Sequence, residues 1–319
     1  MKTAVLLLGF LTGIPLAAVE PPAQRQGETK TVRLLTIGNS FSKNATRFLG
    51  DLAKAGEYSL IHRPIIVGGA SLELHAAKAQ AHERDPENKD GLYANGRSLE
   101  QELCDGPWDF VTIQQASIKS HDVETFRPFA AWLNDCIRRN APGAEALIHE
   151  TWAYRRDDPR FTSPSGKPGE PTSQEAMYRG IREAYGSIAQ ELGIRRIPVG
   201  DAFFLADTDR EWGFRPDTSF DFKTARYPAL PDQTHSLHVG WQWKTLKDGT
   251  RVIRMDGHHA NTTGEYLGGC VWFEVLFGAS VVGNSFVPPG IESAYARFLQ
   301  ETAHRAVAES RTRVSPAVR

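Results

Sequence analysis

The sequence predicts an α/β protein of the three-layer α/β/α type, in which a five-stranded parallel sheet lies between two layers of helices. Two observations predict it. Short β-branched and apolar runs alternate with longer helical segments along most of the 319 residues, which is the pattern of a parallel sheet covered on both faces. Polar residues also follow several of these runs directly, at the strand ends where open sheets bind ligands.

The stretch Thr31–Ser42, TVRLLTIGNSFS, begins this pattern. Its apolar run predicts a short buried strand, which Gly38 ends. Asn39 and Ser40 are residue types that begin helices, and a helix is predicted over 41–55. Ser40 is therefore expected at the carboxyl end of a strand, where a ligand could bind, although Asn39 or Ser40 could also serve only as a helix cap.

The remaining elements follow in order. Strands are predicted at Ser59–Val67, Trp108–Ile113, Ala144–Ile148 and Arg196–Val199, and helices at Leu72–Glu83, Ser98–Cys104, Val123–Arg139, Ser173–Leu192, Gly200–Leu205, Thr262–Phe277 and Ile291–Ser310. Three of the strands are followed by residues of interest, namely Gly68-Gly69, Gln114-Gln115 and Trp152. A glycine pair after a strand is also common in ordinary tight turns.

Residues 206–254 depart from this alternation, and we expect them to be an insertion in a single domain that spans 31–310. An alternating apolar run around Trp241 and Trp243 precedes an Asp-Gly turn at 248–249, which predicts a β-hairpin. Its aromatic residues could simply cover the core. They could also line a substrate cleft, because indole rings stack well on sugar faces.

The amino-terminal residues 1–18, MKTAVLLLGFLTGIPLAA, have the plan of a secretory signal peptide. We expect a disordered lead-in at 19–30 and a polar tail at 311–319. The apolar run is short for a membrane span, so export is favoured over an anchor, with no membrane span in the mature chain. Thirty-seven basic residues against 38 acidic ones do not favour nucleic acid as a partner.

Three cysteines, Cys104, Cys136 and Cys270, are too few and too widely spaced for a disulfide framework. A Cys104–Cys136 disulfide and three small buried thiols are both compatible with the sequence. No C-x-x-C pattern of a zinc site is present.

The block Asp256-Gly257-His258-His259 precedes the helix predicted at 262–277, on a predicted loop. Histidine is the usual proton acceptor for a serine nucleophile, and a carboxylate is needed to hold its ring in the correct tautomer. Asp256 and His259 can meet within one turn, whereas Asp256 and His258 are less well placed. The alternative is that Asp256 caps the helix and the histidines are incidental.

Four blocks in this order resemble the SGNH/GDSL hydrolases: GNSFS at Gly38–Ser42, the pair Gly68-Gly69, the amides Gln114-Gln115, and D-x-x-H at Asp256–His259. More narrowly, the chain resembles a branch of secreted bacterial SGNH-like proteins that carry GNSFS and QQ-x-S. The resemblance runs from about Thr31 to Gly278. It departs from the common pattern where Asn39 replaces Asp and where glutamine replaces the third-block Asn.

The resemblance implies a flavodoxin-like fold and a Ser-His-Asp esterase that needs no cofactor and no metal. Ser40 would be the nucleophile, His259 the base and Asp256 the group that orients the imidazole. The oxyanion donors would be the N–H groups of Ser40 and Gly69 and the side chain of Gln115, with Gln114 as its substitute. The expected substrate-binding residues are Asn39, Trp152, Trp241 and Trp243.

Expected export, near-neutral charge and the aromatic hairpin favour a small acyl ester, acetyl in particular, on a carbohydrate. A lipid esterase of the same fold is the nearest alternative. A metal-dependent hydrolase could use Asp256, His258 and His259 with His149 or Glu150 as ligands. A glycan-binding protein that kept the fold without catalysis is the remaining alternative.

Overall fold

The computed structural model describes residues 30–162 and 170–313 and has one parallel sheet at its centre. The strand order is β2-β1-β3-β4-β5, so the predicted three-layer fold with five parallel strands is confirmed. The strands are β1 Thr31–Gly38, β2 Ser59–Ile66, β3 Phe110–Ile113, β4 Glu145–His149 and β5 Arg195–Ile197. Since β1 lies between β2 and β3, the chain reverses its direction of winding there, and such a switch point is where these sheets bind ligands.

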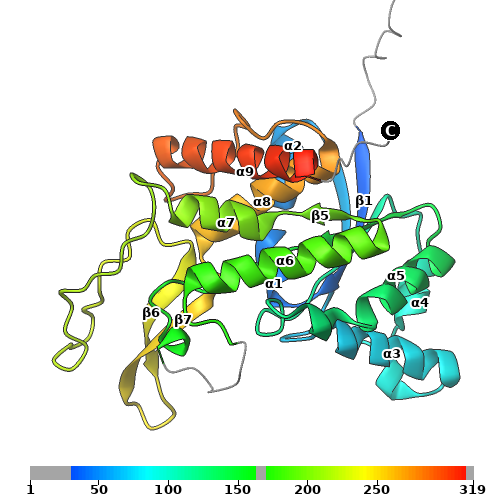
Figure 1. Cartoon of the computed structure of the whole chain (residues 1–319), viewed down its shortest axis with the longest axis horizontal. Helices are drawn as coiled ribbons and strands as arrows, with labels where there is room; N and C mark the ends of the chain where they lie inside the picture. The colour runs from blue at the N-terminus through cyan, green and yellow to red at the C-terminus, as the bar shows by residue number, and fades with distance from the viewer. Residues whose placement is uncertain (1–29, 163–169, 314–319) are drawn as a thin grey trace, which may run out of the picture.

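Helices cover both faces of the sheet (Figure 1). One face is covered by four helices that pack against one another: α3 Leu72–Arg84, α4 Leu99–Cys104, α5 Phe129–Asn140 and α6 Gln174–Leu192. The other face is covered by α1 Ser40–Ala45, α2 Leu49–Ala55, α7 Val199–Asp207, α8 Thr262–Phe277 and α9 Ser293–Arg313, which also pack together. Short 3₁₀ turns are η1 Lys89–Gly91, η2 Val123–Phe126 and η3 Pro159–Phe161.

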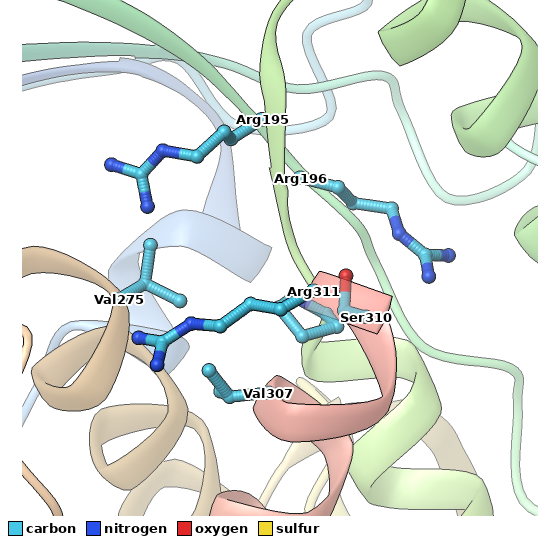
Figure 2. Close-up of a pocket in the computed structure, with 7 residues that line it drawn as sticks. Arg195, Arg196, Val275, Val307, Ser310 and Arg311 are labelled. Carbon is cyan, nitrogen blue, oxygen red and sulfur yellow. The ribbon is translucent and has the colours of Figure 1, made fainter. Parts of the chain in front are cut away.

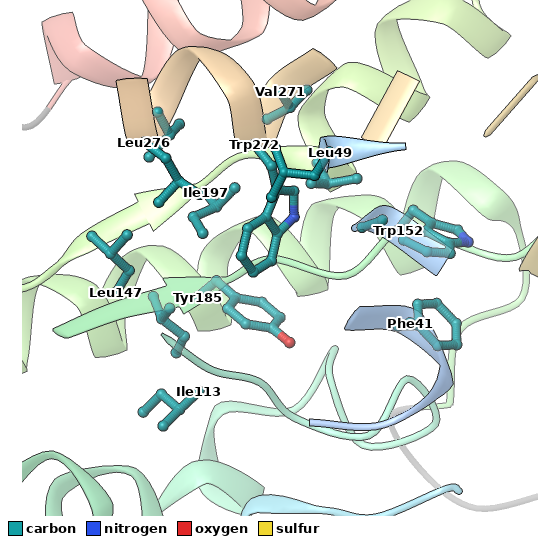
Figure 3. Close-up of a cluster of buried hydrophobic side chains, with 14 of the residues drawn as sticks. Phe41, Leu49, Ile113, Leu147, Trp152, Tyr185, Ile197, Val271, Trp272 and Leu276 are labelled. Atoms are coloured by element: carbon teal, nitrogen blue, oxygen red, sulfur yellow. The ribbon is translucent and has the colours of Figure 1, made fainter. Parts of the chain in front are cut away.

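Helix α8 is the centre of its layer because residues 264–277 are buried on every side. A helix that is apolar all round is expected to be enclosed, and α1, α2, α7 and α9 all contact it. Trp272 projects from α8 toward the strands and lies near Ile197 and Tyr185 (Figure 3). Gly268 lets α1 approach closely, since a Cβ there would be 2.9 Å from Ala45 Cα. The start of α1, with Ser40, is thus fixed against the core.

The predicted hairpin is present, but its second strand is longer than the sequence suggested. Strand β6 spans His238–Thr245 and β7 spans Arg251–Ala260, joined by a tight turn in which Gly249 adopts a φ of +84°. The block 256–259, predicted as a loop, therefore lies within β7. The hairpin projects beyond the edge of the molecule below the helical layers (Figure 1).

Other boundaries differ from the predictions for identifiable reasons. The helix predicted over 123–139 is divided because Pro128, which has no N–H, precedes α5. Helix α9 extends to Arg313, so residues 311–313 are helical rather than part of a tail. All three cysteines are free thiols. The signal peptide predicted at 1–18 and nearly all of the lead-in at 19–30 lie outside the described residues, and no helix in the described part has the length and hydropathy to cross a bilayer.

Candidate active site

Ser40 lies at the sheet's switch point, as the first residue of the helix that follows β1. Asn39 caps this helix, because its Oδ1 accepts the Phe41 N–H at 2.9 Å. The Ser40 N–H has no acceptor within the helix because it belongs to the first turn. Both the hydroxyl and the backbone N–H of Ser40 are thus presented at the carboxyl edge of the sheet.

Strand β7 brings His259 to Ser40 by means of a bulge. Gly240 faces Asp256 and His238 faces Ala260, so residues 257–259 stand opposite one residue of β6. In a regular strand, residues three apart point to opposite faces, whereas a bulge redirects side chains. Here His259 Nδ1 lies 3.0 Å from Asp256 Oδ2, and His259 Nε2 lies 3.0 Å from Ser40 Oγ. Residues 219 positions apart are thereby joined in one hydrogen-bonded row.

The carboxylate of Asp256 is held ionised by its neighbours. Partial burial alone would raise the pKa of this group, but hydrogen bonds from the side chain and backbone of His259, with the nearby charge of His258, outweigh burial and lower it well below its ordinary value. The backbone contact is 3.1 Å from His259 N to Oδ1. An ionised carboxylate accepts the Nδ1 proton of the ring and leaves Nε2 free to take a proton from Ser40.

His258 is a second neighbour of the same carboxylate, with Nδ1 3.1 Å from Asp256 Oδ1. Burial lowers the pKa of His258, and Asp256 opposes that shift. Arg160 Nη2 also lies 3.3 Å from His258 Nδ1, and Arg160 is itself paired with Asp158. His258 therefore belongs to a polar network with Asp256, Arg160 and Asp158 that supports the bulge.

A cluster of buried aromatic side chains packs beside the imidazole of His259. Phe41 lies 6.3 Å from His259 and 4.3 Å from Trp152 between ring centroids, and Trp152 stacks on Phe203 at 4.5 Å. Trp152 has no exposed surface, and its Nε1 donates to the carbonyl of His258. The structure therefore places Trp152, which was expected to bind substrate, in the core, where it fixes the bulge.

The two glutamines after β3 are both buried and both committed to protein partners. Gln115 Nε2 donates to the carbonyl and hydroxyl of Thr125, at 2.8 and 3.3 Å. Gln114 Nε2 donates to Asn39 Oδ1 at 2.6 Å and to the Gln115 carbonyl at 3.1 Å. Each amide group has two N–H bonds, so this arrangement leaves neither side chain a donor for an oxyanion. The expectation that Gln115, or Gln114 in its place, supplies one does not agree with the geometry.

Asn39 and Gly69 complete this edge of the sheet. Asn39, which was expected to bind substrate, is 1% exposed, and its Nδ2 donates to the Ala70 carbonyl at 2.9 Å, so it ties two loops together. Gly69 takes a φ of +68°, a left-handed conformation that suits glycine. Among residues 30–162 and 170–313, no protein acceptor takes its N–H.

Gly240 pairs with Asp256 across the hairpin, so these two residues share one face. Successive residues of a strand point to opposite faces, and Trp241 and Trp243 therefore lie on the other face of the hairpin. Their Nε1 atoms donate to Asp157 Oδ2 at 3.1 Å and to the Ala229 carbonyl at 2.9 Å. A cavity of about 380 Å³ adjoins them, lined by Phe222, Trp241, Trp243, Arg251, Val252 and Ile253. The structure does not bring either indole to Ser40.

The residues considered as metal ligands separate into two groups. Asp256, His258 and His259 place one ligand atom each within 4.8 Å of one another. His149 instead lies in the core, where burial lowers its pKa to about 3 and its Nδ1 is 3.4 Å from Ser42 Oγ. Burial raises the pKa of Glu150, which lies beside Arg196. The first three therefore form the only part of the proposed ligand set that the structure assembles.

A second cavity, of about 160 Å³, lies among β5, α8 and α9, and no triad residue lines it. Arg195 and Arg196 are on its wall, but their guanidinium groups point in opposite directions (Figure 2). Arg195 is paired with Glu145, and Arg196 with Glu150 and Asp201. The charges of these two arginines are balanced by carboxylates, and Arg311, which also lines the cavity, lies 3.5 Å from the Glu274 carbonyl.

The sheet order and the helices on both of its faces define a flavodoxin-like α/β/α protein, which is the fold that the resemblance to SGNH hydrolases implied. The chain belongs to the DUF4886 family, described as "Domain of unknown function (DUF4886)", whose sequence model matches residues 33–230. That match ends before Asp256 and His259. A search of curated proteins found no match.

Solved structures extend the comparison to most of the chain. A DUF4886 family protein from Bacteroides uniformis ATCC 8492 is 26% identical, with a TM-score of 0.65 over 88% of this chain and 95% of that one. A protein described as a GDSL-like lipase from Parabacteroides merdae ATCC 43184 is 13% identical, with a TM-score of 0.43 over 79% and 98%. Phospholipase A1 from Streptomyces albidoflavus NA297 is 10% identical, with a TM-score of 0.31 over 64% and 92%.

Proposed function

We propose that this chain is an exported serine esterase that hydrolyses small acyl esters, with acetyl esters on carbohydrate as its substrates. The observation that carries the proposal is the row of three groups, in which Ser40 Oγ and Asp256 Oδ2 each lie 3.0 Å from opposite nitrogens of His259. A hydroxyl is inert near neutral pH unless a base takes its proton. The row supplies that base and the carboxylate that orients it.

The reaction follows the usual order for such a row of groups. His259 Nε2 takes the hydroxyl proton as Ser40 Oγ bonds to the ester carbonyl carbon, and the carbonyl electrons move to the oxygen. The N–H groups of Ser40 and Gly69 are the proposed donors to that oxyanion. The ester C–O bond then breaks, and the leaving oxygen takes the proton from His259. Water hydrolyses the acyl-enzyme by the same steps, and Ser40 regains its proton.

Polar side chains beside the bulge support a hydroxyl-bearing substrate. Tyr154 packs 5.9 Å from His258 between ring centroids, and its hydroxyl lies 3.1 Å from Ser117 Oγ. The guanidinium of Arg160 lies over the same tyrosine ring. Tyr154 itself is buried, but the Arg160 side chain, which is 43% exposed, offers hydrogen bonds to sugar hydroxyls beside His258.

A lipid esterase remains the second candidate because of two exposed apolar side chains near the same edge. Leu74 lies in the first turn of α3, and Ile118, which is 59% exposed, follows β3. Lys119 pairs with Glu73 at 3.0 Å, which brings these two segments together. A long acyl chain could rest there, and a preference for long-chain nitrophenyl esters over the acetyl ester would favour this candidate.

Covalent labelling tests the proposal most directly. A fluorophosphonate probe reacts only with an activated serine, so we expect the wild-type protein to be labelled at Ser40, as located by peptide mass spectrometry. Ser40→Ala should show no labelling, while Ser59→Ala, at an exposed serine that begins β2, should be labelled as the wild type is. Labelling and hydrolysis should persist in a chelator. Loss of turnover on chelation would instead support a metal bound by Asp256, His258 and His259, and an unlabelled wild-type protein would favour a non-catalytic binding role.

The hairpin aromatics give a separate prediction about substrate size. We propose that a sugar unit distant from the cleaved ester stacks on Trp243, because the indole faces away from Asp256 and borders the hairpin cavity. Trp243→Ala should raise KM on an acetylated polysaccharide about five- to tenfold, the loss expected for one aromatic contact. Turnover of p-nitrophenyl acetate should be unchanged. Equal effects on both substrates would argue against a glycan contact at this cavity.

A further inference from the structure

Two buried amides enclose the backbone around Ser40. Gln114 Oε1 accepts the N–H of Ser42 at 3.0 Å and also the Ser42 hydroxyl. Gln114 Nε2 donates to Asn39 Oδ1 at 2.6 Å. One side chain from the end of β3 therefore holds the residue before Ser40 and the second residue after it.

Asn39 extends this link to the loop after β2. Its Oδ1 also accepts the Phe41 N–H at 2.9 Å, and its Nδ2 donates to the Ala70 carbonyl at 2.9 Å. Ala70 is the residue after Gly69. The chain of hydrogen bonds thus runs from Gln114 through Asn39 to the loop that carries the second proposed oxyanion donor.

The orientation of both amides is dictated by backbone groups. The N–H groups of Phe41 and Ser42 can only donate, and the carbonyl of Ala70 can only accept. Asn39 must therefore present its oxygen to Phe41, and Gln114 must present its oxygen to Ser42. There is also little spare room, since a Cβ on Gly38 would lie 2.4 Å from Ser42 Oγ and 2.8 Å from Gln114 Oε1.

We infer that Gln114 is a positioning residue which, with Asn39, sets the spacing between the N–H groups of Ser40 and Gly69, so that both reach one substrate oxygen. This inference rests on the proposed esterase function. Oxyanion donors act at about 2.7–3.1 Å from the developing charge, and loss of one typically costs about 10²–10³-fold in kcat. The glutamine of the third block thus acts on the oxyanion through the backbone and does not bond to it.

The test is Gln114→Glu, which preserves the shape of the side chain. The new oxygen replaces Nε2 and meets Asn39 Oδ1, so two acceptors face each other unless the introduced carboxyl group is protonated. We expect kcat on p-nitrophenyl acetate at pH 8 to fall about 100-fold, with KM within about threefold of the wild-type value. The ratio of mutant to wild-type kcat should rise as the pH is lowered, because protonation restores a donor to Asn39. A purely structural defect would not recover in this way.

Gln115→Glu is the matched control, since Gln115 is the next residue, equally buried, and would also lose a donor. We expect its kcat per folded molecule to exceed that of Gln114→Glu by at least tenfold. If Gln114→Glu does not fold, Asn39→Asp is the replacement test. This variant keeps the contacts to Phe41 and Gln114, but the new carboxylate oxygen faces the Ala70 carbonyl, and neither oxygen has a proton to donate. Its kcat should fall about tenfold and recover at low pH.

The outcomes distinguish the inference from the proposed function. Fluorophosphonate labelling at Ser40 of the wild-type protein is measured first, and its failure would remove the esterase proposal itself. If the wild-type protein is labelled and Gln114→Glu matches its kcat at pH 8, the positioning role is overturned. A larger loss in Gln115→Glu than in Gln114→Glu would overturn it as well, in favour of Gln115 as a direct donor.

Discussion

Replacement of His259 by alanine should lower kcat on p-nitrophenyl acetate by on the order of 10⁴- to 10⁶-fold, with little change in KM. His259 Nε2 is the group 3.0 Å from the Ser40 hydroxyl, and without it nothing there takes the proton as the ester is attacked. Ser40→Ala should cause a loss of the same size. The double variant should be no worse than either single one, because the two residues act as a unit.

His258→Ala is the matched control for this experiment. His258 is adjacent in sequence, similarly exposed and also in contact with Asp256, at 3.1 Å. It takes part in the network with Arg160, so we expect a loss in kcat of less than about tenfold. If His258→Ala proved as damaging as His259→Ala, the base would have been assigned to the wrong histidine.

The fold was predictable because most of its strands are buried on both faces. Such strands appear in a sequence as continuous apolar runs, as in β3, where Val111, Thr112 and Ile113 are buried. The break before α5 was missed although Pro128 was a visible signal for it. The length of β7 was harder to predict, because Asp256–His259 contains none of the alternation that marks a strand.

The candidate site was only partly predictable, and the reason lies in contacts between distant segments. The family resemblance was needed to pair Ser40 with His259, since no local pattern joins residues so far apart. The bulge that turns His259 toward Asp256 is a property of the register between β6 and β7, which a single strand sequence does not contain.

The sequence did not show which partners from other segments would occupy the side chains of the predicted site. Gln115 was expected to face the substrate, but its amide donates to Thr125. Trp152 was expected to bind substrate, but Phe203 from α7 encloses it. Ser42 was part of the GNSFS motif, and its contact with Gln114 was missed because a second serine in a helix is usually solvent-exposed or caps locally.

Asp256→Asn should lower kcat by on the order of 10⁴-fold, and the geometry specifies why. The backbone N–H of His259 lies 3.1 Å from Oδ1 and can bind only an oxygen, so the amide oxygen of the introduced asparagine should occupy that position. The amide nitrogen would then take the place of Oδ2, 3.0 Å from His259 Nδ1. It would donate to Nδ1 and place the ring proton on Nε2, the tautomer that cannot accept a proton from Ser40.

Asp256→Ala separates this tautomer effect from simple loss of charge. Alanine imposes no tautomer, so its kcat should exceed that of Asp256→Asn, and ¹⁵N NMR of the His259 ring should show Nε2 protonated in the asparagine variant alone. A kcat for Asp256→Asn within tenfold of wild type would contradict the assigned role.

The same carboxylate gives a pH dependence of stability with a definite sign. The folded-state pKa of Asp256 lies below the unfolded value of about 3.9, so the folded state binds fewer protons than the unfolded state. The ionised carboxylate therefore stabilises the fold fully at pH values above the unfolded pKa. This stabilisation is lost as the pH falls through the folded pKa. In thermal unfolding, Asp256→Asn should therefore be less stable than wild type at pH 7, and the difference should shrink progressively below about pH 4. A difference that stayed constant between pH 7 and pH 3 would mean that the ionised carboxylate gains nothing from His259, and the orienting role of Asp256 would lose its electrostatic basis.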